Sequence, residues 1–174
     1  MIAVVKPGLE TSVQDFPGRL GYWEQGFPPS GPMDPWSFRL ANLLVGNEPG
    51  AAGLECQFLG PTLRFEADTV FAVTGADMGP TIDGEPVTLW QSHRAKPRQV
   101  LALGAAVRGA RAYLAFAGAI DCPAVLGSRS TFHQAGIRWP ALRAWPSMPP
   151  IPAWWKVERE PSTAGQSIAP AKAR

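Results

Sequence analysis

Glycine and proline, which recur through most of the chain, restrict the possible folds more than any other feature. The chain has 18 glycines and 19 prolines in 174 residues, about a fifth of the total against about 12% in an average protein. Both residues disfavour long helices, so the excess argues against a helical bundle and favours a turn-rich, mainly β architecture. A hydrophobic fraction of 45% is enough for a packed core. The length predicts one domain, or at most two small ones.

Short apolar or alternating runs, separated by turn signals, predict the strands. They cover residues 2–5, 53–58, 62–65, 69–74, 87–90, 99–103 and 112–117. The run at 69–74 is continuously apolar, which favours a strand buried on both faces. Asp83-Gly84 predicts a type I′ hairpin turn, because both of its central residues need positive φ. Short strands at this spacing are typical of a barrel or sandwich.

One helix is predicted after residue 34. Asp34 suits the N-cap, Pro35 the first helical position and Gly46 the C′ position. The side chains expected to face the core are those at helical spacing, namely Trp36, Leu40, Leu43 and Leu44.

Charge and cysteine usage argue against several classes of protein. With 16 basic and 14 acidic residues the net charge is +2, so we expect no nucleic-acid partner. No apolar run reaches about 18 residues, which predicts no membrane span. No secretory signal is visible, so a cytoplasmic location is expected. Cys56 and Cys122 are expected to be reduced thiols in or near the core. With His93 and His133 they lack the close ligand pairs of structural zinc sites, so we predict no metal.

The composition changes near residue 137. Residues 1–136 contain 17 of the 18 glycines, whereas residues 137–174 contain four of the seven tryptophans and seven prolines. We therefore expect residues 1–137 to form the domain and residues 138–174 to be a divergent Pro/Trp-rich tail outside the fold. The alternative is that the tail is a docking segment.

The segment at residues 13–34 is the first candidate for function. It reads VQDFPGRLGYWEQGFPPSGPMD and is too rich in turn residues to be a regular strand or helix. Long shaped loops in compact domains are usually functional. Its end, SGPMD, runs into the predicted helix, and backbone N–H groups there are expected to face an anion or a developing oxyanion.

Two further stretches carry polar groups beside predicted strands. Asp77 leaves the apolar strand run and is expected either to accept hydrogen bonds from a substrate or to cap a turn. Ser128 and Arg129 lie in LGSRST, which suits a carboxylate or phosphate, or else forms a solvated turn. The chain has no P-loop, no nucleophile elbow and no biotin attachment sequence, so we expect ATP and biotin to be handled elsewhere.

Four stretches in a fixed order resemble a known family. They are VQDFPGRLGYWEQGFPPSGPMDPWSFRLANLLVGN, GLECQFLGPTLRF, VTGADMGPTIDGEPVTLW and RAYLAFAGAIDCPAVLGSRSTF. The chain resembles the allophanate hydrolase subunit 2 family, or biotin-dependent carboxyltransferase family, over residues 3–136. This family includes the carboxyltransferase part of urea carboxylase and urea amidolyase, and the C subunit of 5-oxoprolinase. Tyr22-Trp23 followed by PPSGPMD is most similar to the urea carboxylase branch.

The resemblance implies a cyclophilin-like β-barrel domain with one or two short helices, paired with a sister carboxyltransferase or hydrolase domain or subunit. It also implies transfer of a carboxyl group from carboxybiotin to a small amide substrate, urea, to form allophanate. Biotin would be carried by a biotin-carrier domain, and ATP would be used by a biotin carboxylase in the same complex. The alternatives are a component of 5-oxoprolinase or allophanate hydrolase that acts on an amide or lactam, and a non-catalytic regulatory module.

Residue chemistry and motif position together suggest the site residues. The residues expected to be catalytic are Asp15, Arg19, Asp34 and Asp77. The residues expected to bind substrate are Gln14, Ser30, Gly31, Met33, Ser128 and Arg129. Aspartates would orient the N–H groups of urea, and Arg19 and the SGPMD amides would stabilise negative charge.

Family members continue past LGSRSTF with a glycine-rich stretch, whereas here the resemblance ends near residue 137. We therefore expect a domain that is incomplete relative to the family and inactive as a fragment. Missing strands are expected to leave unpaired edges, so that the chain is weakly soluble without a partner. A frame change after codon 137 is the hypothesis for this departure. Translation of the coding DNA in the other two frames tests it.

Overall fold

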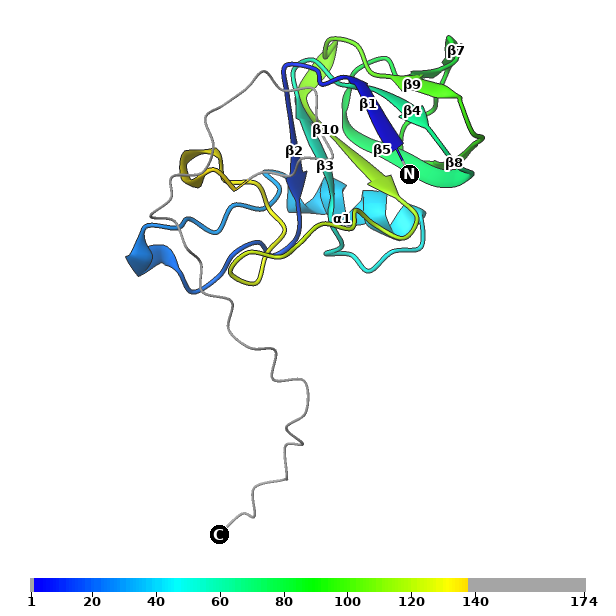
Figure 1. The fold of residues 1–174 in the computed structure, drawn as a ribbon. Helices are drawn as coiled ribbons and strands as arrows, with labels where there is room; N and C mark the ends of the chain where they lie inside the picture. The colour runs from blue at the N-terminus through cyan, green and yellow to red at the C-terminus, as the bar shows by residue number, and fades with distance from the viewer. Residues whose placement is uncertain (1, 138–174) are drawn as a thin grey trace, which may run out of the picture.

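The structure, a computed structural model, describes residues 2–137, which form two five-stranded antiparallel sheets and one α-helix (Figure 1). The first sheet has the strand order β1 (Ile2–Lys6), β4 (Thr62–Phe65), β9 (Val100–Ala102), β6 (Thr81–Ile82) and β7 (Glu85–Pro86). The second has the order β2 (Glu10–Gln14), β3 (Gly53–Gln57), β10 (Arg108–Phe116), β5 (Thr69–Asp77) and β8 (Ser92–Ala95). The prediction of a mainly β fold is confirmed. Within residues 2–137 the strands form two separate sheets and not one closed barrel.

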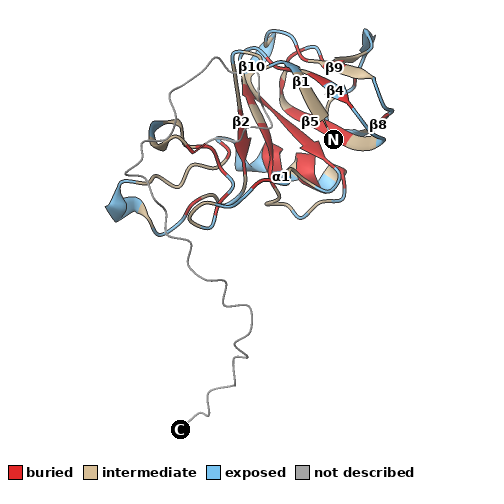
Figure 2. Ribbon diagram, viewed as in Figure 1, coloured by how far each residue is buried: buried red, intermediate tan, exposed pale blue. Residues whose placement is uncertain are grey.

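The core lies between the two sheets. Leu63 and Leu101 of the first sheet pack in one cluster with Leu54 and Leu114 of the second, and all four are at most 2% exposed. Figure 2 shows this burial concentrated along the central strands of the second sheet. In β5, alternate side chains belong to this cluster and to the one under the helix. The predicted strand buried on both faces is therefore confirmed.

The helix α1 (Pro35–Leu44) begins and ends as predicted. Asp34 is its N-cap, Pro35 is its first residue, and Gly46 follows the C-cap with a φ of +79°. A short 3₁₀ turn, η1 (Trp23–Gln25), precedes it, and a second, η2 (His133–Ala135), lies near residue 137. The expectation of one or two short helices is therefore confirmed.

The buried face of α1 differs in part from the predicted one. Leu40 and Leu44 are half-buried, and Leu44 packs against the cluster beneath the helix, but Trp36 is 69% exposed and Leu43 is 53% exposed. The residues that are buried are Ser37, Phe38, Ala41 and Asn42. Small side chains let the helix pack closely against Ala72 and Ala115 of β5 and β10. The buried polar groups find partners, since Asn42 Nδ2 donates to the Ala51 carbonyl at 2.9 Å. Apolar spacing alone could not reveal a face built from small and polar residues.

The predicted hairpin forms, but its second strand is shorter than expected. Asp83 and Gly84 have φ values of +51° and +90° and connect β6 to β7. The predicted strand at residues 87–90 is wrong, because the chain leaves the sheet after Pro86 and turns before β8. The strands β2 and β8 were not predicted, since their sequences ETSVQ and SHRA contain few apolar residues.

The two cysteines are buried and free, as expected. Burial raises the pKa of the Cys56 thiol to about 12. In the part of the chain that the structure describes, no group of three or more His, Cys, Asp or Glu side chains is arranged to hold a metal. Over the same residues, α1 is too short to cross a bilayer and no other helix is longer.

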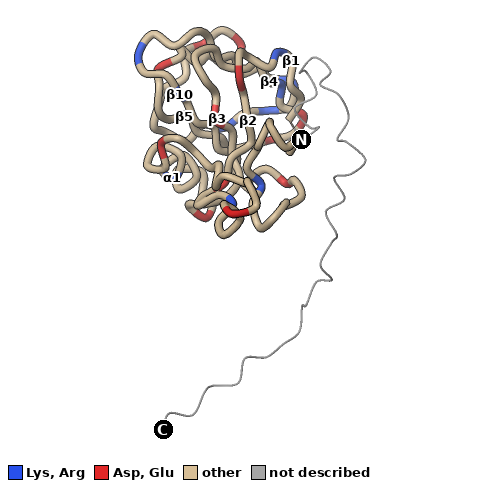
Figure 3. Tube along the Cα trace, turned by 90° about the vertical axis from the view of Figure 1, so that its left-hand side faces the viewer, with Lys and Arg blue, Asp and Glu red and all other residues tan. Residues whose placement is uncertain are grey.

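Basic and acidic residues are dispersed over the molecule. Figure 3 shows Lys, Arg, Asp and Glu scattered along the tube with no extended region of one sign.

The expected tail at residues 138–174 lies outside the described residues.

Candidate functional site

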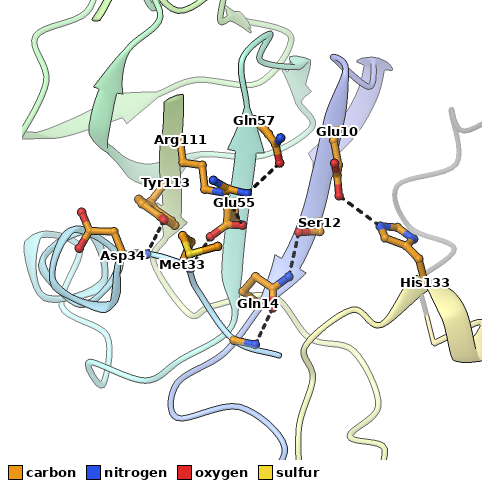
Figure 4. Close-up of polar contacts among 11 residues, drawn as sticks. Glu10, Ser12, Gln14, Met33, Asp34, Glu55, Gln57, Arg111, Tyr113 and His133 are labelled. Carbon is orange, nitrogen blue, oxygen red and sulfur yellow. Dashed lines mark hydrogen bonds and ion pairs between the residues drawn. The ribbon is translucent and has the colours of Figure 1, made fainter. Parts of the chain in front are cut away.

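One face of the second sheet carries polar side chains, while its other face packs on the core. The polar residues are Glu10, Ser12 and Gln14 of β2, Glu55 and Gln57 of β3, and Arg111 and Tyr113 of β10 (Figure 4). Successive side chains of a strand point to opposite faces, so residues two apart share a face. Strand pairing places Ser12, Glu55 and Tyr113 side by side, and Glu10, Gln57 and Arg111 beside them. We refer to these seven residues as the polar face.

The loop before α1 is anchored on the polar face by its backbone N–H groups. The N–H of Gly31 donates to Gln14 Oε1 at 3.0 Å, and the N–H of Met33 donates to Glu55 Oε2 at 2.7 Å. The N–H of Asp34 donates to the Tyr113 hydroxyl at 2.8 Å. These SGPMD amides, expected to face an anion, therefore serve acceptors of the protein itself (Figure 4).

Glu55 and Arg111 form the charged centre of the polar face. Arg111 Nε lies 3.3 Å from Glu55 Oε1, and Arg111 Nη2 donates to Gln57 Oε1 at 3.0 Å. The side chains of Arg111 and Glu55 are 26% and 12% exposed. Burial, and then the negative charge of Glu55, raise the pKa of Tyr113, so its hydroxyl keeps its proton at neutral pH. A guanidinium, a carboxylate and a phenol thus share one partly desolvated surface.

Asp34 is both a cap and part of the site. Its carboxylate accepts hydrogen bonds from the N–H groups of Trp36 and Ser37, at 3.0 Å and 3.1 Å, and from the Ser37 hydroxyl. Partial burial raises the pKa of this carboxyl, but the hydrogen bonds from Ser37 and Trp36 outweigh it and hold the pKa below its ordinary value. Asp34 is therefore charged at neutral pH, with its oxygens directed to the start of α1.

An open cavity of about 400 Å³ adjoins the polar face. It is lined by Met33, Asp34, Ser37, Gly75, Ala76, Trp90, Arg108, Gly109, Ala110, Arg111 and Tyr113. The cavity thus lies between the start of α1, the last residues of β5, the first residues of β10, and the turn before β8. Its lining combines two guanidinium groups, a phenol and an indole.

A bulge in β10 shapes this cavity. The pairing of β10 with β5 shifts from Arg108 opposite Asp77 to Ala112 opposite Gly75. Gly75 and Gly109 have φ values of +81° and +84°, a region that favours glycine. A Cβ on Gly75 would lie 2.5 Å from the Arg111 carbonyl oxygen. Bulges redirect side chains and are frequent beside active sites, and this one places Arg108 and Arg111 at the cavity.

Four of the predicted site residues meet in a different contact, in which Arg19 and Ser128 are buried, Asp15 is half-buried and Arg129 is exposed. The Asp15 carboxylate accepts from the Ser128 hydroxyl at 2.5 Å, the Arg129 N–H at 2.7 Å and the Ser130 hydroxyl at 2.6 Å. Arg19 is 1% exposed and donates to the carbonyls of Val125, at 3.1 Å, and Ser130, at 2.9 Å. Burial lowers the pKa of Arg19, although Asp15 opposes the shift. This contact joins residues 15–19 to residues 125–130, which run side by side in Figure 1.

The remaining predicted residues divide between the polar face and the strand end. Gln14, Gly31, Met33 and Asp34 lie at the polar face or the cavity, and Ser30 lies beside them in the loop with a φ of +56°. Asp77 ends β5, where its Oδ1 accepts from the N–H of Gly79 at 3.0 Å. The predicted site residues therefore form two groups, one at the polar face and cavity and one around Asp15 and Arg19, and Asp77 belongs to neither. Their roles in catalysis stay predictions.

Sequence reasoning missed Glu55, Gln57, Arg111, Tyr113 and Arg108. One signal could have revealed four of them. Polar residues stand two apart in GLECQ (Glu55, Gln57) and in RAY (Arg111, Tyr113), which indicates that each strand has a polar face. The register that brings these two strands together was not contained in that signal.

Comparisons with known proteins give consistent matches. The family model described as carboxyltransferase domain, subdomain A and B, matches residues 25–145. Urea amidolyase of Saccharomyces cerevisiae is 46% identical over 136 residues, which are 78% of this chain and 7% of that protein. The C subunit of 5-oxoprolinase from Escherichia coli is 41% identical over 139 residues, which are 79% of this chain and 44% of that protein.

A solved structure matches the fold as well. The crystal structure of the K. lactis urea amidolyase superimposes with a TM-score of 0.77 at 45% sequence identity, over 79% of this chain and 8% of that chain. The chain thus spans less than half the length of each of these relatives.

Proposed function

The chain belongs to the carboxyltransferase domain family, subdomains A and B, and on that premise we propose that it is part of a biotin-dependent carboxyltransferase. In the finer form of the proposal, it contributes to moving a carboxyl group from carboxybiotin to urea, which gives allophanate. The 46% identity with a urea amidolyase supports urea as the acceptor.

The observation that carries this proposal is the cavity beside the polar face. Its volume of about 400 Å³ suits a small molecule. An amide substrate offers N–H donors and a carbonyl acceptor, and the cavity lining offers Asp34 as an acceptor and Arg111 as a donor. Both side chains are held by hydrogen bonds to other residues, so they are positioned before a substrate binds.

The proposed reaction asks this chain to position groups and to exclude water. Biotin, carried by another domain, would supply the carboxyl group. Transfer would break the nitrogen–carbon bond of the donor and form a nitrogen–carbon bond to urea, and the proton lost by urea would balance the one gained by the donor nitrogen. Water would consume the carboxyl group, so a partly enclosed site favours transfer. Asp34 would orient the urea N–H groups, while Arg111 would hold negative charge.

We further propose that the chain works in a complex. A biotin carboxylase, a biotin-carrier domain and a sister carboxyltransferase domain would supply the carboxyl group, its carrier and the rest of the site. The short share of its relatives that this chain spans supports this proposal. Trp23 and Trp36 are 72% and 69% exposed, and large exposed apolar side chains of this kind are frequent at interfaces.

A second candidate is supported by the 41% identity with the C subunit of a 5-oxoprolinase. In that case the cavity would hold a cyclic amide, and the chain would act as one component of a lactam-hydrolysing enzyme. The same donors and acceptors suit a lactam, so the polar face alone does not discriminate between the two candidates.

Substrate-dependent ATP consumption tests the two candidates. The full chain would be co-expressed with a biotin carboxylase, a biotin-carrier domain and the sister domain, and the complex assayed with urea or 5-oxoproline. We expect urea to stimulate ATP consumption, and Arg111→Gln to abolish that stimulation. Arg94→Gln makes the same charge change on β8, away from the cavity, and is the control. Stimulation by 5-oxoproline alone supports the second candidate, and a soluble complex that responds to neither substrate contradicts both.

A further inference from the structure

We propose that Arg108 and Arg111 form a carboxylate-binding subsite in the cavity, with the Trp90 indole as a platform for the planar group attached to that carboxylate. The ligand class is a small amide or ureido compound that carries a carboxylate. The inference rests on the proposed function, because it specifies where the carboxyl group would be held once it is attached to an amide.

Arg108 and Arg111 both have guanidinium N–H groups that form no hydrogen bond with residues 2–137. Arg111 uses Nε and Nη2 to bind Glu55 and Gln57, and no hydrogen bond within residues 2–137 involves its Nη1. Arg108 lines the same cavity and has no ion pair with any described residue. Two arginines with unused N–H groups at one cavity match the two oxygens of a carboxylate.

The carboxylates beside the cavity already accept hydrogen bonds from donors of the protein. Asp34 also lines the cavity, but its carboxylate accepts the N–H groups of Trp36 and Ser37. Glu55 is occupied by Arg111 and by the N–H of Met33. Asp34 and Glu55 balance the two guanidinium charges, so a ligand carboxylate would be held by the unused N–H donors and not by an excess of positive charge.

Trp90 is held at the cavity in an uncommon conformation. Its φ is +63°, which is rare for a bulky residue. Its backbone N–H donates to the Val73 carbonyl of β5 at 2.8 Å. Its side chain lines the cavity, and the residue is 42% exposed. These contacts hold the backbone of Trp90 at the cavity, where its indole offers a flat apolar surface to a planar amide.

Direct binding to the full chain tests this subsite without requiring turnover. The main probe is hydantoate, a stable ureido compound with a carboxylate. Ethylurea lacks the carboxylate, and butyrate lacks the ureido group. Isothermal titration would compare the unmodified chain with Arg108→Gln, Arg111→Gln and the control Arg94→Gln. Because Arg111→Gln also removes the pair with Glu55, Arg108→Gln tests the subsite without that loss.

We expect hydantoate to bind, and each cavity substitution to weaken it about tenfold or more, as loss of a charged hydrogen bond would. Arg94→Gln should leave binding unchanged, and ethylurea should bind equally weakly to all forms. Hydantoate that binds equally to the unmodified chain and both cavity variants, or that does not bind at all, overturns the subsite. Butyrate that binds as tightly as hydantoate, and depends equally on both arginines, supports the carboxylate subsite but contradicts Trp90 as a platform for the planar group.

Discussion

At the scale of single residues, Asp34 links the start of the helix to the polar face. Its N–H donates to the Tyr113 hydroxyl, and its carboxylate accepts from the first turn of α1. The cap was predictable because capping depends on neighbours in sequence. The partner Tyr113 lies 79 residues away, so this half of its role could not be predicted.

The Asp34 cap leads to a prediction about stability and pH. Replacement by alanine should lower the free energy of unfolding by about 1 kcal/mol at pH 7. The folded-state pKa of Asp34 lies below its ordinary value, so the charged cap stabilises the fold above the ordinary carboxyl pKa. That contribution is lost as the pH falls through the folded-state pKa.

Chemical unfolding at pH 7 and at about pH 3 checks this prediction. The difference between the unmodified chain and Asp34→Ala should shrink at the lower pH. Asp68→Ala, at an exposed position between β4 and β5 whose side chain has no hydrogen bond to residues 2–137, should have little effect at either pH. An equal loss for Asp34→Ala at both pH values would contradict a role for the charge.

At the scale of elements, strands with apolar sequences were predictable and polar ones were not. The run at residues 69–74 is apolar throughout and was recognised, although β5 continues to Asp77. In contrast, β2 was missed because it is recognisable only when paired with β3, through Thr11 opposite Cys56 and Val13 opposite Leu54. The polar face also uses β3 and β10, which were largely predicted as strands, but their register with each other and with β2 was not, and this explains why most of the face escaped prediction.

The β10 bulge should depend on Gly75. An alanine there would adopt a positive φ and would also bring its Cβ to 2.5 Å from the Arg111 carbonyl oxygen. Gly84 has a φ of +90° and open space around it, so it isolates the conformational cost. We expect Gly84→Ala to cost about 1 kcal/mol and Gly75→Ala about 3 kcal/mol or more.

Thermal unfolding of the two alanine variants measures this difference. If the bulge shapes the cavity, Gly75→Ala should also weaken hydantoate binding, whereas Gly84→Ala should not. Equal destabilisation by the two substitutions would show that close packing at Gly75 contributes nothing.

At the scale of the whole molecule, Arg19 joins distant parts of the chain. Its guanidinium binds carbonyls that lie 106 and 111 residues away in sequence, and its Nη1 has no partner among the described residues. Replacement by alanine would leave the Ser130 carbonyl without its donor, and the Val125 carbonyl with only the N–H of Ser128. The expected loss is about 3 kcal/mol of unfolding free energy.

Arg94→Ala, at an exposed position of β8, provides a matched control for loss of an arginine. Its melting temperature should stay close to that of the unmodified chain, while Arg19→Ala should melt well below it. Carboxyl transfer by the complex should also fall with Arg19→Ala, because Asp15 shares this contact and precedes the loop that is anchored on the polar face. An unchanged melting temperature and unchanged transfer would rule out both effects.

The family could be predicted from the sequence, but the cavity could not. Long motifs in a fixed order identified a carboxyltransferase-like domain, and the family match agrees. The cavity arises because α1, the turn at Trp90 and the bulge at Gly109 meet beside the polar face. The arrangement of these three elements depends on strand register and on packing between residues far apart in sequence, so no single motif predicts it.

The most direct test of the central claim is transfer of ¹³C from labelled bicarbonate to urea, followed by NMR, in a complex that contains this chain. We predict that labelled allophanate forms when the chain is present with its biotin carboxylase, carrier and sister domain. Its formation should stop with Arg111→Gln and continue with Arg94→Gln. Labelled product that forms equally without this chain, or equally with Arg111→Gln, would contradict the account.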